Sequence, residues 1–230
     1  MRPLIVALDV ETDKEALAMA RRLKPWVDVF KVGPVLFLKY GSRLIEDLRS
    51  EGAEIFLDLK FHDIPSVVRR SVERAAEWGV YSATIHAAGG QAMMRDAASA
   101  SPRPKLWGVT VLTSLDAGDL QTLGIRRSVR NQVKTLARKA CEAGLDGVVS
   151  SAREAGDVRA ACGPQFQIVT PGIRLAEASD DQKRVETPAE ALRRGATFLV
   201  MGRPVIEAKD PAAVVQQIYE SIEGGRRDTR

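Results

Sequence analysis

Residues 58–63 read DLKFHD and place unlike charges directly after the apolar run 55–57. Side chains alternate between the two faces of a strand, so Asp58 and Lys60 share one face, opposite Leu57 and Leu59. Taking a charge out of water is costly unless the charge is paired. The hexapeptide therefore predicts either an ion pair that closes the end of a strand, or a site where a carboxylate and an ammonium act on a substrate.

The elements that must position these charges form a repeating pattern. Short apolar runs alternate with segments of helical periodicity, such as 13–24, 35–50 and 64–78. Eight β–α alternations predict a (β/α)₈ TIM barrel, a single domain over residues 1–230. A doubly wound open sheet is the alternative, but no GxGxxG motif follows the first strand. The expected strands are 4–8, 27–32, 54–59, 81–86, 105–112, 146–149, 166–170 and 197–201.

Charged and polar residues gather where the expected strands end, which is where barrel enzymes place their active sites. Taken singly, each has an ordinary explanation. Asp9 or Asp63 could cap the helix that follows, Lys31 could extend outward to water, and His86 could be a hydrogen-bonded core residue. Two lysines and three aspartates at three adjacent strand ends are harder to explain as a stability device, and mutual pairing favours their charged forms. The set is Asp9, Lys31, Asp58, Lys60 and Asp63, followed at the fourth and fifth ends by His86, Thr113 and Ser114.

The end of the eighth expected strand has the composition of a phosphate site. Gly202 and Arg203 stand where the strand turns into a helix. A glycine lets backbone N–H groups approach a ligand, and a helix start favours negative charge. Arg203 would add a charge-assisted contact, although a surface arginine is the plainer alternative. The polar segment 171–187 is long enough for an active-site loop, and its Arg174 and Gln182 could close over the same phosphate.

Composition argues against several other classes of protein. The net charge is +4 and the arginine pairs are scattered, so the chain lacks the basic block of a nucleic-acid-binding protein. Two cysteines and two histidines outside any metal-like spacing argue against a zinc site. Neither a long apolar run nor a signal peptide is evident. We expect a cytoplasmic protein without a membrane span, with reduced thiols and a frayed tail at about 224–230.

Several segments resemble one enzyme family. FLDLKFHDIPSVV contains DxKxxDIP, the signature of orotidine 5′-phosphate decarboxylases. The segments IVALD, KVGPVLF, VTVLTSL, PGIR, DDQKR and MGRPVI are similar to other parts of that family and occur in its order. The resemblance covers residues 4 to about 206. DxKxxD alone is shared with related sugar-phosphate enzymes, whereas the full set is specific.

The resemblance implies decarboxylation of orotidine 5′-monophosphate to UMP, in pyrimidine biosynthesis, with no cofactor and no metal. It implies that Lys60 delivers a proton to the pyrimidine C6 as carbon dioxide leaves, and that Asp58 lies against the substrate carboxylate. Lys31 would hold Asp58 and contact the ribose. Asp63 would come from the other subunit of a homodimer and complete a Lys-Asp-Lys-Asp network.

The resemblance also implies how the rest of the nucleotide is held. Asp9 would bind a ribose hydroxyl, and Thr113 with the neighbouring Ser114 would lie along the pyrimidine. The phosphate would be held by Arg174, Gln182, Gly202 and Arg203, the first two from the closing loop.

Two alternatives and one departure from the family stay open at this stage. Mg²⁺-dependent enzymes, such as 3-keto-gulonate 6-phosphate decarboxylases and hexulose-phosphate synthases, resemble the same barrel. They tend to carry an acid on the second strand, where Lys31 would repel Mg²⁺. A non-catalytic nucleotide-binding barrel is the other alternative, but no catalytic position is missing. The family usually reads DIPNT, whereas this chain has Ser66 and Val67, so a threonine hydroxyl expected near the ribose is absent.

Overall fold

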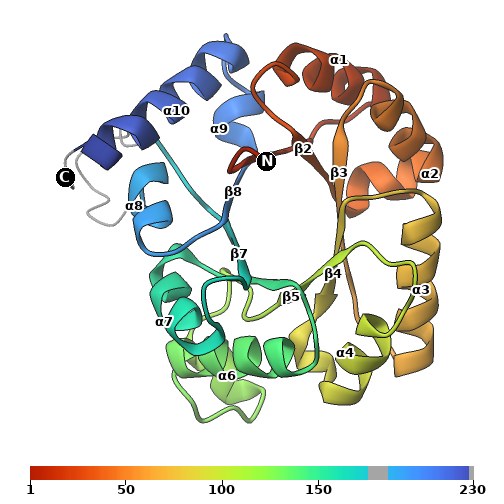
Figure 1. Cartoon of the computed structure of the whole chain (residues 1–230), viewed down its shortest axis with the longest axis vertical. Helices are drawn as coiled ribbons and strands as arrows, with labels where there is room; N and C mark the ends of the chain where they lie inside the picture. Colours follow the sequence, from red (N-terminus) through yellow and green to blue (C-terminus); the bar gives the residue numbers. More distant parts are fainter. Residues whose placement is uncertain (176–185, 228–230) are drawn as a thin grey trace.

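The computed structural model describes residues 1–175 and 186–227, which contain a closed β-barrel (Figure 1). Each strand pairs in parallel with its neighbour in sequence, and β8 pairs with β1 to close the sheet. The predicted (β/α)₈ barrel is thereby confirmed. Its strands are β1 (Leu4–Ala7), β2 (Val29–Val32), β3 (Glu54–Phe61), β4 (Ser82–His86), β5 (Lys105–Val109), β6 (Gly147–Val149), β7 (Gln167–Pro171) and β8 (Phe198–Met201).

Helices form a ring outside the barrel (Figure 1). Among the described residues, none of them is long and apolar enough to cross a membrane. The last helix reaches residue 227, so the described part of the expected tail is helical. The helices are α1 (Asp13–Leu23), α2 (Pro34–Ser50), α3 (Pro65–Glu77), α4 (Gln91–Ala98), α5 (Ala117–Thr122), α6 (Val129–Glu142), α7 (Ala152–Cys162), α8 (Pro188–Arg193), α9 (Arg203–Ile206) and α10 (Pro211–Arg227), with a 3₁₀ turn η1 (Ala87–Gly89).

Local sequence signals fix how the first helices begin. Thr12 caps α1 in a reciprocal capping box with Glu15, so the alternative role of Asp9 as the cap of α1 is not realised. Proline occupies the first position of both α2 and α3, where its missing N–H costs nothing. α3 starts at Pro65, only four residues after β3 ends at Phe61. DLKFHD therefore covers the last four residues of β3 and the first two of the short connection to α3, at the mouth of the barrel.

The barrel interior is a packed core rather than a channel. Trp107 fills its centre, edge-on to Phe56 at 4.7 Å between ring centroids, and its indole N–H donates to Gln167 Oε1 at 2.8 Å. Bulky side chains at this level leave room for a ligand only toward the carboxyl ends of the strands. The buried inner layer consists of Ile5, Ala7, Val29, Phe56, Trp107, Val169, Phe198 and Val200.

β5 is shorter than its sequence predicts. The apolar run continues to residue 112, yet the strand ends at Val109. Its neighbour β6 ends at Val149, whose carbonyl accepts both the backbone N–H and the hydroxyl of Thr110, at 3.3 and 2.8 Å. Beyond Thr110 the described residues form no further strand pairing on that side, and residues 111–114 form a bend and a turn, three of them lining the smaller cavity at the mouth of the barrel.

Arg159 on α7 is a partly buried cation that binds backbone carbonyls instead of a carboxylate. Its Nη1 donates to the carbonyl oxygens of Gly163, Pro164 and Phe166 at 2.8, 2.9 and 2.6 Å. Its Nη2 donates to the Gly195 carbonyl at 2.8 Å and to the Thr197 hydroxyl at 3.2 Å. Burial lowers the pKa of this guanidinium. One side chain thus ties the loop after α7 to the loop before β8.

Replacing Arg159 with methionine should destabilise the fold strongly. Methionine keeps most of the side-chain volume but leaves several carbonyls without a donor, and we expect a loss of about 2–3 kcal/mol in the free energy of unfolding. Urea denaturation measures this change in the free energy of unfolding. Arg138→Met, on the exposed face of α6, is the matched control and should change stability by less than about 0.5 kcal/mol. Equal losses of stability in the two variants would contradict the proposal that Arg159 holds the two loops together.

Candidate active site

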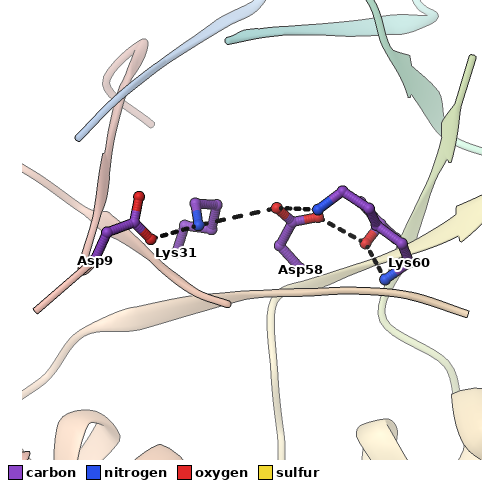
Figure 2. A network of polar contacts seen from close by, with 5 residues as sticks. Asp9, Lys31, Asp58 and Lys60 are labelled. Carbon is purple, nitrogen blue, oxygen red and sulfur yellow. Dashed lines mark hydrogen bonds and ion pairs between the residues drawn. The ribbon is translucent and has the colours of Figure 1, made fainter. Parts of the chain in front are cut away.

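Four charged side chains form a row across the mouth of the barrel (Figure 2). Lys60 Nζ lies 2.9 Å from Asp58 Oδ2, and Lys31 Nζ lies 3.9 Å from the same oxygen. On its other side Lys31 Nζ donates to Asp9 Oδ1 at 3.0 Å. The row therefore alternates in sign, Asp9–Lys31–Asp58–Lys60. It brings together residues of β2 and β3 with Asp9, two residues beyond the end of β1.

Burial increases from one end of the row toward its middle. The side chains of Lys31 and Asp58 are 12% and 14% exposed, whereas Lys60 is 33% and Asp9 54% exposed. Charges act on one another more strongly where water is excluded, so the field is stronger at the buried middle of the row, around Lys31 and Asp58, than at its exposed Asp9 end. Lys31 does not extend outward to solvent, which removes the ordinary explanation for it.

β3 departs from a regular strand within DLKFHD. Leu57 is buried beneath the helices and Leu59 packs on the same outer core, as alternation predicts. Lys60, however, has φ +51°, and it is the only residue other than glycine with a positive φ in the described part of the chain. The register of β3 against β4 also shifts between Leu57 and Phe61. A bulge therefore re-aims Lys60, as bulges next to active sites do.

Thr84 on β4 is a member of the site that the sequence analysis missed. Its hydroxyl donates to Asp58 Oδ1 at 2.9 Å and accepts the backbone N–H of Lys60 at 2.9 Å. The alternation in SATIH places Thr84 on the same face as His86, and this was the available signal. The sequence gives no reason to single out an inward-facing threonine, because its hydrogen-bond partners on the neighbouring strand cannot be deduced from it.

The row borders two hollows of the surface. A cavity of about 210 Å³ is lined by Lys31, Asp58, Lys60 and Thr113, among others. A more open hollow of about 530 Å³ adjoins it and is lined by Asp9, Lys31, Arg174, Gly202 and Arg203. The two hollows share Lys31 in their linings, so the charged row and the residues around Gly202 and Arg203 border adjoining spaces.

The remaining expected residues lie outside this arrangement. Ser114 is exposed in the turn after β5 and does not line either hollow. Gln182 lies outside the described residues. Asp63 is exposed, and its Oδ1 accepts the N–H of the next residue, Ile64, at 2.6 Å. Ile64, not Asp63, occupies the cap position of α3, so the helix-cap explanation of Asp63 is wrong.

His86 stands beside the row as a half-buried imidazole. Its ring lies 5.2 Å from that of His62, between centroids. Burial lowers the pKa of His86, and the nearby His62 and Lys60 lower it further, whereas Asp58 acts in the opposite direction. The lowered pKa favours the neutral form of the His86 imidazole at neutral pH. Among the described residues, no cluster of three or more His, Cys, Asp or Glu side chains is arranged to hold a metal ion.

Comparison with known proteins identifies the family. The model of the orotidine 5′-phosphate decarboxylase / HUMPS family matches residues 2–218. The chain belongs to this family. It is 47% identical over 222 residues to an orotidine 5′-phosphate decarboxylase of Neisseria meningitidis, covering 94% of this chain and 90% of that one. It is also 47% identical to the orotidine 5′-phosphate decarboxylase of Hydrogenovibrio crunogenus, covering 95% of each chain.

A solved structure agrees with these relatives. The crystal structure of orotidine 5′-phosphate decarboxylase from Lactobacillus acidophilus superposes with a TM-score of 0.85 at 35% sequence identity. The match covers 96% of this chain and 99% of that one. The resemblance stated from the sequence motifs is thus confirmed at the level of the family. The individual residue roles stay predictions.

Proposed function

We propose that this enzyme decarboxylates orotidine 5′-monophosphate to UMP, without a cofactor, by holding fixed charges around a carbanion at C6. The decarboxylase activity and its place in pyrimidine biosynthesis follow from the family and from the relatives of 47% identity. The observation that carries the mechanism is the row of alternating charges at the cavity, with Lys60 at one end of it.

In the proposed reaction the bond between C6 and the carboxylate carbon breaks, and its electron pair stays on C6. Carbon dioxide leaves, and a proton from Lys60 Nζ forms the new C–H bond. Asp58 lies beside the departing carboxylate and holds Lys60 at 2.9 Å. Because the row is fixed by the fold before substrate arrives, stabilising the carbanion needs little reorganisation of charge.

The rest of the nucleotide supplies binding energy away from the reacting carbon. In this proposal Asp9 and Lys31 contact the ribose, and Thr113, which lines the smaller cavity, lies along the pyrimidine. Arg174, Gln182, Gly202 and Arg203 grip the phosphate. Three of these four line the open hollow of about 530 Å³ together with Asp9. Binding energy spent at the phosphate can drive closure of the site and orient the pyrimidine over Lys60.

The position of Lys31 favours this reaction over the Mg²⁺-dependent chemistry of related barrels. Its ammonium lies 3.0 Å from Asp9 and 3.9 Å from Asp58, so it already occupies the space between the two carboxylates. A divalent cation bound there would have to displace a fixed positive charge.

The test is turnover by metal-stripped enzyme. We expect the absorbance change of orotidine 5′-monophosphate to proceed at the same rate, within about twofold, before and after EDTA treatment, and added Mg²⁺ to change nothing. Activity that disappears with EDTA and returns with Mg²⁺ would contradict the cofactor-free mechanism. Absence of turnover under both conditions would contradict the proposed function itself.

We further propose that the enzyme is a homodimer in which Asp63 of one chain completes the site of the other. Asp63 is exposed within its own chain, next to Ile64, an apolar side chain that is 63% exposed. At the start of α2, Val35 and Leu38 are 72% and 85% exposed. Apolar side chains exposed beside a site fit a surface that a second copy covers. A cytoplasmic location stays a prediction.

A further inference from the structure

Thr84 sits directly behind the charge row with its side chain completely buried. Its single hydroxyl bridges two parts of the catalytic motif, the Asp58 carboxylate and the Lys60 backbone, at 2.9 Å each. Thr84 does not line the cavity that the charges border, so contact with the substrate does not explain this bridge.

The bridge coincides with the bulge in β3. Opposite β4, Leu57 pairs with Ala83 and Phe61 pairs with Ile85. Between these two pairs, β3 has three residues, 58–60, whereas β4 has only one, Thr84. Lys60, at φ +51°, has its N–H turned to the Thr84 hydroxyl instead of a strand carbonyl. An amide N–H buried without a partner is costly, so this hydroxyl helps to hold a conformation that a lysine rarely adopts.

The direction of the two hydrogen bonds follows from their chemistry. The Lys60 amide can only donate, so the Thr84 oxygen accepts from it, and the one hydroxyl hydrogen is left for Asp58 Oδ1. The two oxygens of Asp58 are thereby divided. Oδ1 is held by Thr84, while Oδ2 faces Lys60 at 2.9 Å and Lys31 at 3.9 Å.

We propose that Thr84 is a positioning residue for the decarboxylation, fixing the plane of the Asp58 carboxylate and the backbone from which Lys60 extends. This inference rests on the proposed function. The second torsion of an aspartate side chain is broad, so a carboxylate held at one oxygen only can rotate. Both the negative charge beside the leaving group and the proton donor would then move away from the reacting carbon.

The test compares Thr84→Val with Thr84→Ser. Valine keeps the shape but removes the hydroxyl, and we expect kcat to fall about 10- to 100-fold, because small misplacements of reacting groups have effects of that size. KM, and the Kd for UMP, should stay within about threefold of wild type. Serine restores the hydroxyl and should bring kcat back to within about threefold.

Thr110→Val is the matched control for a merely structural effect. Thr110 is also a buried threonine at the mouth of the barrel, but its hydroxyl donates to the backbone carbonyl of Val149. Both valine variants should lower the melting temperature, whereas only Thr84→Val should lower kcat. If Thr84→Val does not fold, Thr84→Cys replaces it, with an expected kcat below that of the serine variant.

The outcomes separate this inference from the proposed function. Wild-type turnover together with a kcat of Thr84→Val within about twofold of wild type would overturn the positioning role alone. A serine variant as slow as the valine variant would also overturn it, because the hydroxyl would then not be what matters. Wild-type enzyme that does not turn over orotidine 5′-monophosphate would overturn both.

Discussion

Lys60→Ala should lower kcat for decarboxylation by about 10⁴-fold or more, because it removes both the proton donor and the cation next to the carbanion. Binding of UMP should stay within about threefold, since the product lacks the carboxylate and its phosphate is held elsewhere. Stopped-flow or steady-state measurement of orotidine 5′-monophosphate absorbance gives kcat, and calorimetric titration gives the Kd for UMP. The protein should still fold, because Asp58 keeps its contacts with Lys31 and Thr84.

Lys105→Ala is the matched control for the loss of a lysine from a strand. Lys105 begins β5, at the end of the barrel opposite the active site. Its removal should leave kcat within about twofold of wild type. A near-normal rate in Lys60→Ala would refute Lys60 as the proton donor. Loss of both turnover and UMP binding would indicate that the lysine holds the nucleotide instead.

The core of the site could be predicted from sequence because its geometry follows from local rules. Period-two alternation puts Asp58 and Lys60 on one face of β3, and the parallel order of a barrel puts the end of β2 beside it. Lys31 therefore had to lie within reach of Asp58. The structure finds this arrangement, with Lys31 Nζ 3.9 Å from Asp58 Oδ2.

What could not be predicted depends on contacts between segments distant in sequence. The left-handed backbone of Lys60 is allowed by the bulge against β4 and held there by Thr84, 24 residues away. Nothing in DLKFHD itself requires it. Arg159 is a similar case, since the carbonyls that it binds belong to two loops, one of them 36 residues further along the chain. Sequence periodicity predicts which face of an element a side chain lies on, but not which distant residue it will hydrogen-bond.

For Asp63, the role implied by the sequence differs from what the structure of a single chain shows. Family resemblance assigns it to catalysis, yet within one chain its carboxylate bonds only the Ile64 N–H in the contacts of the described residues. If it acts across a dimer, Asp63→Ala should lower kcat by about 10²-fold or more, although the residue is exposed and carries no packing.

Mixing two inactive variants tests the shared site directly. In a heterodimer of Lys60→Ala and Asp63→Ala chains, one site lacks both residues and the other has an intact Lys60 and an intact Asp63. Half of randomly assembled dimers are heterodimers, so co-expression should restore about a quarter of wild-type activity. The measurement is turnover by heterodimer purified through two different tags, which should approach about half of the wild-type rate.

The pairing of Lys60→Ala with Asp58→Ala provides the matched control. Asp58 and Lys60 belong to the same chain and the same site, 2.9 Å apart, so every site in that heterodimer lacks one of them. No activity should return. Rescue by Asp63→Ala together with no rescue by Asp58→Ala would show that Asp63, unlike Asp58, is contributed across the interface. Equal behaviour of the two mixtures would place Asp63 within its own site and contradict the shared arrangement.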